Sequence, residues 1–283
     1  MKLAYSGILF PEDYDPLIKE VESCFQHKLG PGDLPTKRKE DRIYGILVPH
    51  SLYKFSGPCS AWAYKTIAEN YFPETFVILF PDTSGKFINY ATILEDIETV
   101  FGTCYVDKQI GRVLVEQGIV TLANNFREYS FELQLPFLQH MCKDKIHDVK
   151  ILPIIIPHSF NAGKLAEEII KIKKDLVVIM VSELTAFGAN FLYQPFKYNI
   201  DESVNGQDMA LIKFILDFDS EGFFKYVKKN KIPMPGKDAV VVGIELLKQL
   251  GVKKGELLSY YRSNEIDDDK ENFVSYSSLV FTV

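Results

Sequence analysis

The sequence lacks the features that mark a membrane protein or a nucleic-acid-binding protein. No run approaches the ~20 consecutive apolar residues of a membrane helix, and Gly7 and Pro11 interrupt the first apolar stretch before acidic residues follow, unlike a signal peptide. The net charge is −6 and the pI is near 5.5, so no excess of basic charge is present to hold nucleic acid or an anionic membrane. We therefore expect a cytoplasmic protein that binds neither.

Cysteine is scarce, and no Cys-x-x-Cys pair occurs, so nothing predicts a structural zinc site or a disulfide framework. The phosphate loop, the dinucleotide fingerprint and the common nucleophile motifs are also absent, and the sequence motifs name no reaction. We expect the cysteines to be small, buried, apolar side chains; they are Cys24, Cys59, Cys104 and Cys142.

What the chain does contain is an alternation of strand and helix patterns. Short β-branched runs bounded by breakers are typical of buried parallel strands, and helical patterns lie between them, one with Pro58 in its first turn and one capped by Asn161. The sequence predicts one α/β domain over residues 1–283, with a mixed, mostly parallel central sheet and helices on both faces. The predicted strands are 43–48, 75–80, 149–156, 176–181, 256–262 and 273–282, the last two forming a hairpin; the predicted helices are 58–69, 107–117, 161–173, 202–217, 220–229 and 237–250.

Polar residues follow the four predicted parallel strands. In such sheets, ligands bind beyond the carboxyl ends of the strands, which selects His50, Asp82 with Thr83, His158 and Glu183. Each signal is ambiguous alone. Asp82 begins a stretch that also suits an ordinary turn, His158 suits a structural or exposed histidine, and Glu183 suits either a cleft carboxylate or a partner for a backbone amide.

The stretch "REYSFELQLPFLQH" carries two carboxylates, Glu128 and Glu132, one helical turn apart. Like charges at this spacing repel slightly unless a positive group lies near. The simpler interpretation is a solvated acidic first turn that the helix dipole favours.

Taken in order, these stretches resemble the Memo family, the protein B component of the AmmeMemoRadiSam system, which is related in fold to class III extradiol dioxygenases. The matching segments are "SGILFP", "VPHSLYKFSGPCSAWAY", "FVILFPDTS", "EYSFELQLPFLQ", "VSELTAFG" and "MPGKDAVVVGIELL", spread over nearly the whole chain. The resemblance implies a dioxygenase-like fold, and it implies AMMECR-type and radical-SAM proteins as candidate partners.

The departures from the family pattern fall on the residues that would hold a metal. By the resemblance, iron or copper ligands would come from His50 and from the positions of Thr83 and Pro235, where the family has a histidine and a cysteine. Tyr129 and Ala186 also stand where the family has histidines. One imidazole cannot supply a complete ligand set for such a metal, so we expect a degenerate site with no cofactor. An alternative set for a divalent ion such as magnesium or manganese is His50, Asp82, Glu183 and Asp238.

The leading hypothesis is a Memo-like binding or interaction protein with a metal-free cleft. The alternative is an enzyme, a metal-dependent oxygenase or a hydrolase, in which His50 works beside Glu183 or Asp82 in acid-base chemistry. A third hypothesis is a subunit whose surface matters more than its cleft. The candidate cleft and ligand-binding residues are His50, Tyr53, Asp82, Thr83, Glu128, Glu183, Lys237 and Asp238.

Overall fold

Four parallel strands form the centre of the sheet in the computed structural model, which describes residues 1–124, 127–145, 147–148, 150–158 and 162–283. They are β1 (Gly45–Val48), β8 (Leu176–Val181), β2 (Thr75–Pro81) and β7 (Lys150–Ile156), lying side by side in that order. Their side chains alternate between two cores: Leu47 and Val77 belong to an upper core, and Ile46 and Ile78 to a lower one. Because both faces are buried, these strands are apolar throughout.

The C-terminal hairpin extends the sheet beyond β1. Strand β11 (Phe273–Thr282) pairs antiparallel with both β1 and β10 (Lys254–Arg262), so the sheet is mixed. The eleven strands of the described ranges also include short ones at the β7 edge and beside β11: β3 (Ala91–Thr92), β4 (Ile97–Thr99), β5 (Gly102–Val106), β6 (Thr121–Leu122) and β9 (Ala186–Phe187).

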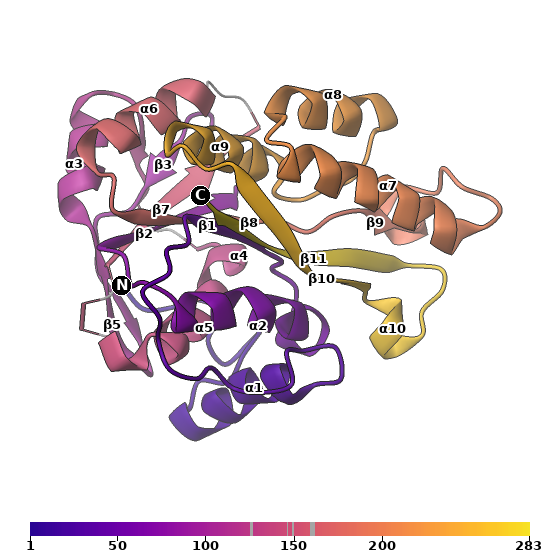
Figure 1. Ribbon diagram of the computed structural model, residues 1–283, viewed down its shortest axis with the longest axis horizontal. Helices are drawn as coiled ribbons and strands as arrows, with labels where there is room; N and C mark the ends of the chain where they lie inside the picture. The colour runs from indigo at the N-terminus through magenta and orange to yellow at the C-terminus, as the bar shows by residue number, and fades with distance from the viewer. Residues whose placement is uncertain (125–126, 146, 149, 159–161) are drawn as a thin grey trace.

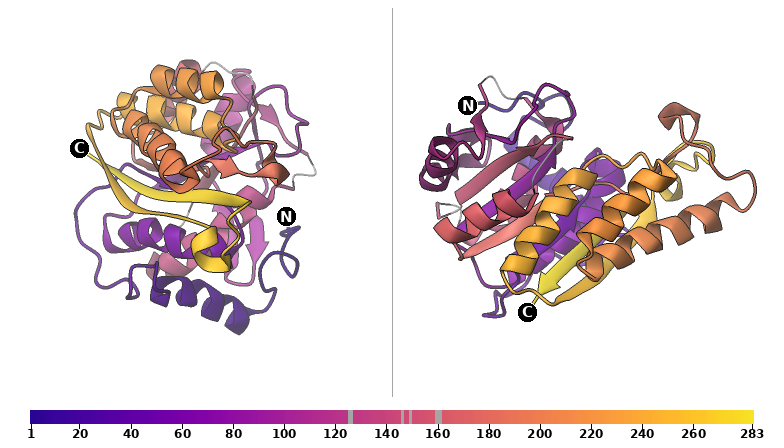
Figure 2. Two further views of the ribbon diagram at one scale, coloured as in Figure 1. Left: turned by 90° about the vertical axis from the view of Figure 1, so that its right-hand side faces the viewer. Right: turned by 90° about the horizontal axis from the view of Figure 1, so that it is seen from above.

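Helices cover both faces of the sheet (Figures 1 and 2). The lower layer contains α1 (Tyr14–Gln26), α2 (Tyr53–Glu69), α4 (Tyr129–Glu132) and α5 (Gln134–Met141). The upper layer contains α3 (Lys108–Glu116), α6 (Ala162–Ile172), α7 (Ile200–Leu216), α8 (Ser220–Asn230) and α9 (Lys237–Gln249). A short helix, α10 (Asn264–Asp267), lies in the loop of the hairpin, and the 3₁₀ turns are Lys143–Lys145 and Ala189–Phe191.

The predicted elements are confirmed, with one clear error at the start of α2. The helix begins at Tyr53 and contains Pro58, which the sequence placed in its first turn. Close packing against α1 accounts for the additional turn of α2 before Pro58. A Cβ on Gly57 would lie 2.4 Å from the sulfur of Cys24 on α1, so α1 covers the segment that precedes the proline. The predicted cap Asn161 lies outside the described residues.

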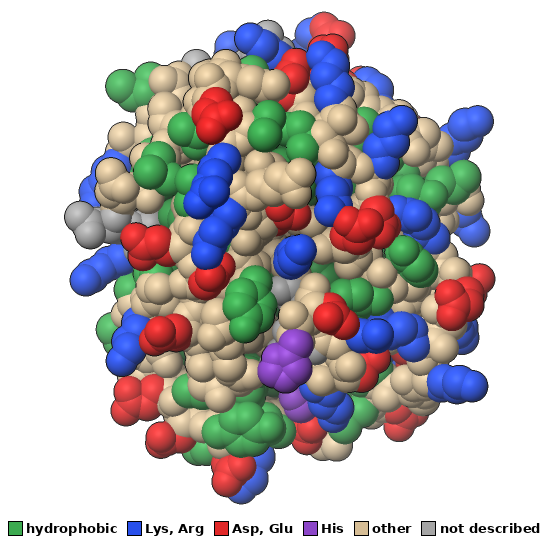
Figure 3. Space-filling view, turned by 90° about the vertical axis from the view of Figure 1, so that its left-hand side faces the viewer, with side chains coloured by type: hydrophobic (Ala, Val, Ile, Leu, Met, Phe, Trp, Pro, Cys, Tyr) green, Lys and Arg blue, Asp and Glu red, His purple; other side chains and the backbone are tan. Residues whose placement is uncertain are grey.

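The four cysteines are free and buried, as the sequence predicts. Burial raises the pKa of Cys24, Cys104 and Cys142 to about 12, so these thiols stay protonated at neutral pH. On the face in Figure 3, basic and acidic side chains are intermixed, without a large area of one sign. None of the helices in the described ranges combines the length and apolarity that a membrane crossing requires.

Candidate functional site

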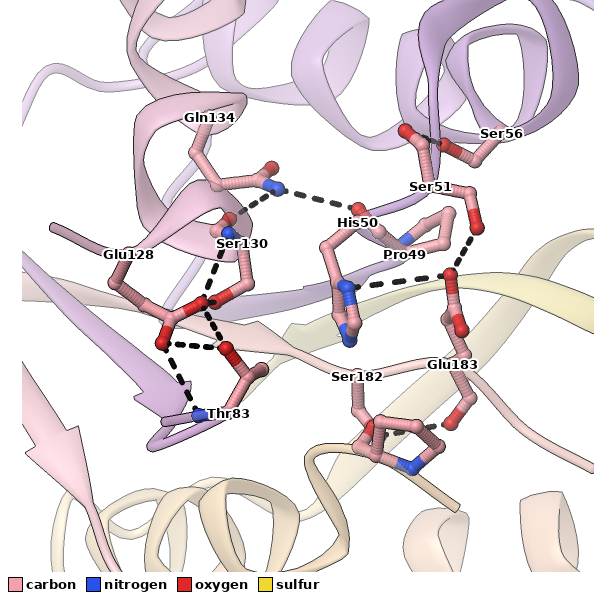
Figure 4. A network of polar contacts seen from close by, with 11 residues as sticks. Pro49, His50, Ser51, Ser56, Thr83, Glu128, Ser130, Gln134, Ser182 and Glu183 are labelled. Carbon is pink, nitrogen blue, oxygen red and sulfur yellow. Dashed lines mark hydrogen bonds and ion pairs between the residues drawn. The ribbon is translucent and has the colours of Figure 1, made fainter. Parts of the chain in front are cut away.

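The ends of β1, β2 and β8 bring three sequence-distant polar segments to one edge of the sheet. The backbone fixes their relative positions, because the amide of Ser182 donates to the carbonyl of Val48, and that of Asp82 donates to Ile156 at the end of β7. Glu128, from a fourth segment at the start of α4, lies beside them. We call the resulting group the strand-end site and define it as His50, Ser51, Thr83, Glu128 and Glu183. Figure 4 shows His50 between Thr83 and Glu128 on one side and Glu183 on the other.

His50 is buried and has no hydrogen-bond partner among the described residues. It is 2% exposed, and both ring nitrogens are unpaired. Its Nδ1 lies 3.9 Å from Oε1 of Glu183, which is too long for a hydrogen bond. The ring of Tyr129 packs edge-on against the imidazole, with centroids 5.7 Å apart. Since buried polar groups are nearly always paired, His50 retains the capacity to bind an additional group.

The backbone before His50 is fixed by α5. The side-chain amide of Gln134 donates to the carbonyl of Pro49 at 3.2 Å and to that of Ser130 at 3.0 Å. His50 is therefore held at its backbone while its side chain is left unbound. Such rigid support is what a binding residue requires.

Ser51 is a member of the site that sequence reasoning missed. Its hydroxyl donates to Oε1 of Glu183, the same oxygen that faces His50. The hydroxyl of Ser182 in turn donates to the carbonyl of Pro235 at 3.0 Å. Ser51 follows His50 directly, so its position after a predicted strand could have identified it. A single serine in a loop is, however, too common to be selected from the sequence.

Thr83 and Glu128 face His50 from the other side but are bound to each other. The Thr83 hydroxyl donates to both carboxylate oxygens of Glu128, at 2.8 and 2.9 Å, and its amide donates at 3.1 Å. Ser130 adds its hydroxyl at 3.1 Å. The amides and hydroxyls of Thr83 and Ser130 thus give this carboxylate four hydrogen-bond donors, counting the long amide contact of Ser130 at 3.4 Å, and such bonds favour its charged form.

The expected solvated acidic turn is wrong. Glu128 and Glu132 are both buried, at 3% and 0% exposure. The backbone amides of Ala4 and Tyr5 donate to the two oxygens of Glu132 at 3.0 and 2.9 Å, so this carboxylate ties the N-terminal segment to α4. Burial raises the pKa of Glu132, and the backbone bonds oppose that rise.

Two other candidates have structural roles. Tyr53 is buried in the lower core, where its hydroxyl donates to the carbonyl of Leu133 at 2.6 Å, and it does not face the site. Asp82 holds its own turn together, accepting from the hydroxyl of Ser84 at 2.6 Å and the amide of Phe87 at 2.7 Å. The turn interpretation of this stretch is confirmed.

The start of α9 brings Lys237 and Asp238 to the same edge. Gly236 makes this possible, because its φ is +95° and a Cβ there would lie 2.4 Å from the carbonyl oxygen of Val181. Oδ2 of Asp238 lies 2.9 Å from Nδ1 of His158 and 3.2 Å from Nζ of Lys237. These groups form a separate cluster around Asp238.

The residues at the expected metal positions do not fit iron or copper. His50 offers an imidazole, but the hydroxyl of Thr83 is bound to Glu128, and Pro235 offers only a carbonyl that accepts from Ser182. Over the described ranges, no three His, Cys, Asp or Glu side chains are grouped to hold an ion. The alternative set of His50, Asp82, Glu183 and Asp238 is thus not assembled, because Asp82 and Asp238 have other partners.

Comparisons with known proteins agree with the fold. A family model described as Memo-like protein matches residues 2–280. A MEMO1 family protein of Methanopyrus kandleri is 32% identical, over 98% of this chain and 97% of that protein. A MEMO1 family protein of Pyrococcus furiosus is 33% identical, over 97% and 96%. An uncharacterized protein of Escherichia coli K12 has a similar structure, with a TM-score of 0.51 at 14% identity over 86% of this chain and 100% of that one.

The sheet and its two helical layers define a single α/β fold with a mixed, mostly parallel sheet, which the Escherichia coli structure shares. The chain belongs to the Memo family.

Proposed function

We propose that this Memo-family chain is a binding or interaction protein whose strand-end site works without a metal ion. The observation that carries the proposal is the donor set: of the three positions at which the family resemblance puts metal ligands, only His50 has a free metal-binding atom. A borderline or soft metal needs several imidazole or thiolate ligands. The cysteines do not replace them, because they are buried with raised pKa values.

The ligand is a polar group that donates a hydrogen bond to His50. If the neutral imidazole directs an Nδ1–H toward Glu183, then Nε2 is left as an acceptor, and a hydroxyl or amide N–H of a small molecule or peptide satisfies it. Tyr129 lies against the imidazole, so binding requires this ring to move. AMMECR-type and radical-SAM proteins, implied by the family, are the partners to test first.

Elemental analysis of protein purified without tags or chelators tests the proposal, with His50→Ala as the matched control. We expect less than stoichiometric iron, copper, zinc and manganese in both proteins. Stoichiometric metal in the native chain that disappears in His50→Ala would overturn the metal-free site.

A second function, an enzyme with a rebuilt histidine and carboxylate pair, is favoured by one contact. Nδ1 of His50 and Oε1 of Glu183 are 3.9 Å apart, a separation that a small rearrangement closes to hydrogen-bond length. General acid-base catalysis needs such a pair. Calorimetric titration with magnesium and manganese tests the metal-dependent form of this enzyme: binding at micromolar concentration supports it, and no binding at millimolar concentration excludes it.

A further inference from the structure

A cavity lies between the N-terminal segment and the loops that follow β3 and β6. Its volume is about 680 Å³, within the range of roughly 300–1,000 Å³ that small-molecule sites occupy. The lining comes from residues 1–4, 86, 93–95, 122–124 and 127. We call it the basic cavity. Among the described residues it shares none with the strand-end site, although Arg127 directly precedes Glu128.

Backbone hydrogen bonds fix the walls of the basic cavity. Lys2 forms a parallel β-bridge with Glu98 of β4, and the amide of Glu98 donates to the carbonyl of Met1 at 2.8 Å. The amide of Ala123 donates to the carbonyl of Thr92 in β3, also at 2.8 Å. A cavity with fixed walls needs little ordering of the chain when a ligand binds.

Three cationic side chains line the cavity: Lys2, Lys86 and Arg127. Within the described ranges, none of the three forms an ion pair with a carboxylate. The lining includes one acidic residue, Glu95, and it is exposed. Positive charge therefore exceeds negative charge around the cavity.

The carboxylates next to these segments are bound by other groups. Asp96 pairs with Lys108 at 2.5 Å. Glu132 accepts from two backbone amides; burial raises its pKa, and the charge of Arg127 is one of the effects that oppose this rise. Glu128 is held by the hydroxyls of its neighbours. These contacts leave the three cations available to an added anion.

The rest of the lining is largely apolar. Ile93 and Ala123 are buried, at 3% and 7% exposure, and Leu3, Leu94 and Leu122 also line the cavity. Covering such side chains with a hydrocarbon group is favourable because it removes apolar surface from water. An apolar surface beside unpaired cations matches an organic anion, whose carboxylate or phosphate accepts charge-assisted hydrogen bonds.

Other ligand classes fit less well. A cationic ligand would be repelled by the two lysines and the arginine. A metal ion has no group of three His, Cys, Asp or Glu side chains to hold it anywhere in the part of the chain that the structure describes. A neutral apolar molecule would leave the cations unused.

We propose that the basic cavity binds a small organic anion, with a carboxylate or phosphate group at Lys86 and Arg127 and a hydrocarbon portion against Leu94 and Leu122. The cavity would then be a second binding site beside the strand-end site. The inference does not depend on the metal-free function, because it uses no residue of the strand-end site.

Calorimetric titration at low ionic strength with hexanoate and with hexyl phosphate tests the proposal. Acetate and inorganic phosphate carry the same charged groups without the hydrocarbon chain, and 1-hexanol carries the chain without a charge. We expect at least one of the two organic anions to bind at submillimolar concentration and the three comparison compounds to bind at least about tenfold more weakly. The tighter of the two anions identifies the charged group as carboxylate or phosphate.

Lys86→Gln and Arg127→Gln should each weaken binding about tenfold, the loss expected for one charge-assisted hydrogen bond. Lys86 is exposed and has no ion-pair partner among the described residues, so Lys86→Gln should melt at the native temperature. Weaker binding by this variant would therefore not reflect unfolding.

The matched control is a double variant carrying Lys228→Gln and Lys229→Gln. It removes two positive charges from exposed positions on α8, in the upper layer, just as Lys86→Gln with Arg127→Gln removes two from the cavity. The control should bind the organic anion as the native chain does. The cavity double variant should bind it about a hundredfold more weakly, because two independent losses add.

The proposal is overturned if neither organic anion binds at millimolar concentration, if 1-hexanol binds as tightly as they do, or if the two double variants weaken binding equally. Its failure is separable from failure of the metal-free function. Stoichiometric metal lost in His50→Ala would overturn the metal-free function and leave anion binding at Lys86 and Arg127 in place.

Discussion

Two buried polar clusters follow the same strand, β8, and differ in how completely their hydrogen bonds are made. In the first, His50 beside Glu183 has two unpaired nitrogens. In the second, Asp208 of α7 accepts from the amide and hydroxyl of Thr185, at 3.2 and 2.6 Å, and from the hydroxyl of Tyr260 at 2.8 Å. Glu183 and Thr185 are only two residues apart, yet one cluster is left incomplete.

The second cluster, which we call the Asp208 network, continues outward. The side chain of Gln207 donates to the Thr185 hydroxyl at 2.8 Å, and the hydroxyl of Tyr193 donates to Gln207 at 2.9 Å. A fully paired buried network fixes one arrangement of the chain, whereas an unpaired group costs stability and is retained only where something else uses it. The difference supports a structural role for Asp208 and a binding role for His50.

Asp208→Ala should cause the largest loss of stability. The substitution leaves the amide and hydroxyl of Thr185 and the hydroxyl of Tyr260 without an acceptor. Each unpaired donor should lower the free energy of unfolding by about 1 kcal/mol or more. We expect the free energy of unfolding at pH 5 to fall by about 3 kcal/mol, measured by urea denaturation. A loss below about 1 kcal/mol would mean that the network is not structural.

Asp208 should also give the protein a specific pH dependence. Burial raises its pKa from 3.8 to about 6, and the hydrogen bonds oppose this rise. Because the folded pKa is above the unfolded one, its favourable contribution is complete below about pH 4 and is lost as the pH rises through about 6. The change is about 3 kcal/mol for a shift of about two units.

The control for this pH dependence is Asp208→Asn, which does not titrate. Between about pH 4 and 6 the native chain should lose about 3 kcal/mol relative to this variant, with no relative change outside that window. Parallel stability curves for the two proteins across the whole range would show that Asp208 does not carry the effect.

Tyr260→Phe should have a smaller effect. It removes one hydrogen bond to a carboxylate, and we expect a loss of about 1.5 kcal/mol near pH 7.5. Thermal and urea denaturation measure it. An unchanged midpoint would indicate that Asp208 finds another donor.

His50→Leu should have the smallest effect. The leucine has a similar volume and removes two buried nitrogens that have no partner in the described ranges, so the free energy of unfolding should change by less than about 0.5 kcal/mol. A loss comparable to that of Asp208→Ala would make His50 a structural residue and remove the contrast between the clusters.

The strands were predictable because burial on both faces makes their composition distinctive. The 176–181 and 273–282 predictions match β8 and β11 at both ends. The start of α2 was not predictable, because its first turn depends on packing against α1, which local sequence does not report. Pro58 is a strong local signal for a helix start, and tertiary contact at Gly57 overrode it.

For the site, sequence position located the strand ends but not the direction of each side chain. His50, Thr83 and Glu183 lie at one edge because the strands that precede them end there, and Glu128, at the start of α4, is bound to Thr83. Tyr53 was misplaced because it lies only three positions after His50 in the sequence, and its burial depends on the lower helices. Whether a buried carboxylate such as Glu128 or Glu132 finds donors depends on residues tens of positions away.

The central claim is that His50 remains from a metal site whose other ligands are gone. Restoring the missing ligands tests this claim most directly, in a variant that carries both Thr83→His and Pro235→Cys. The native chain and this variant are exposed to iron(II), copper(II) or zinc in the same way and desalted, and their metal contents are then compared. The account predicts that the native chain retains none of these ions and that the double variant retains about one per chain. Stoichiometric metal in the native chain, held equally by both proteins, would contradict it.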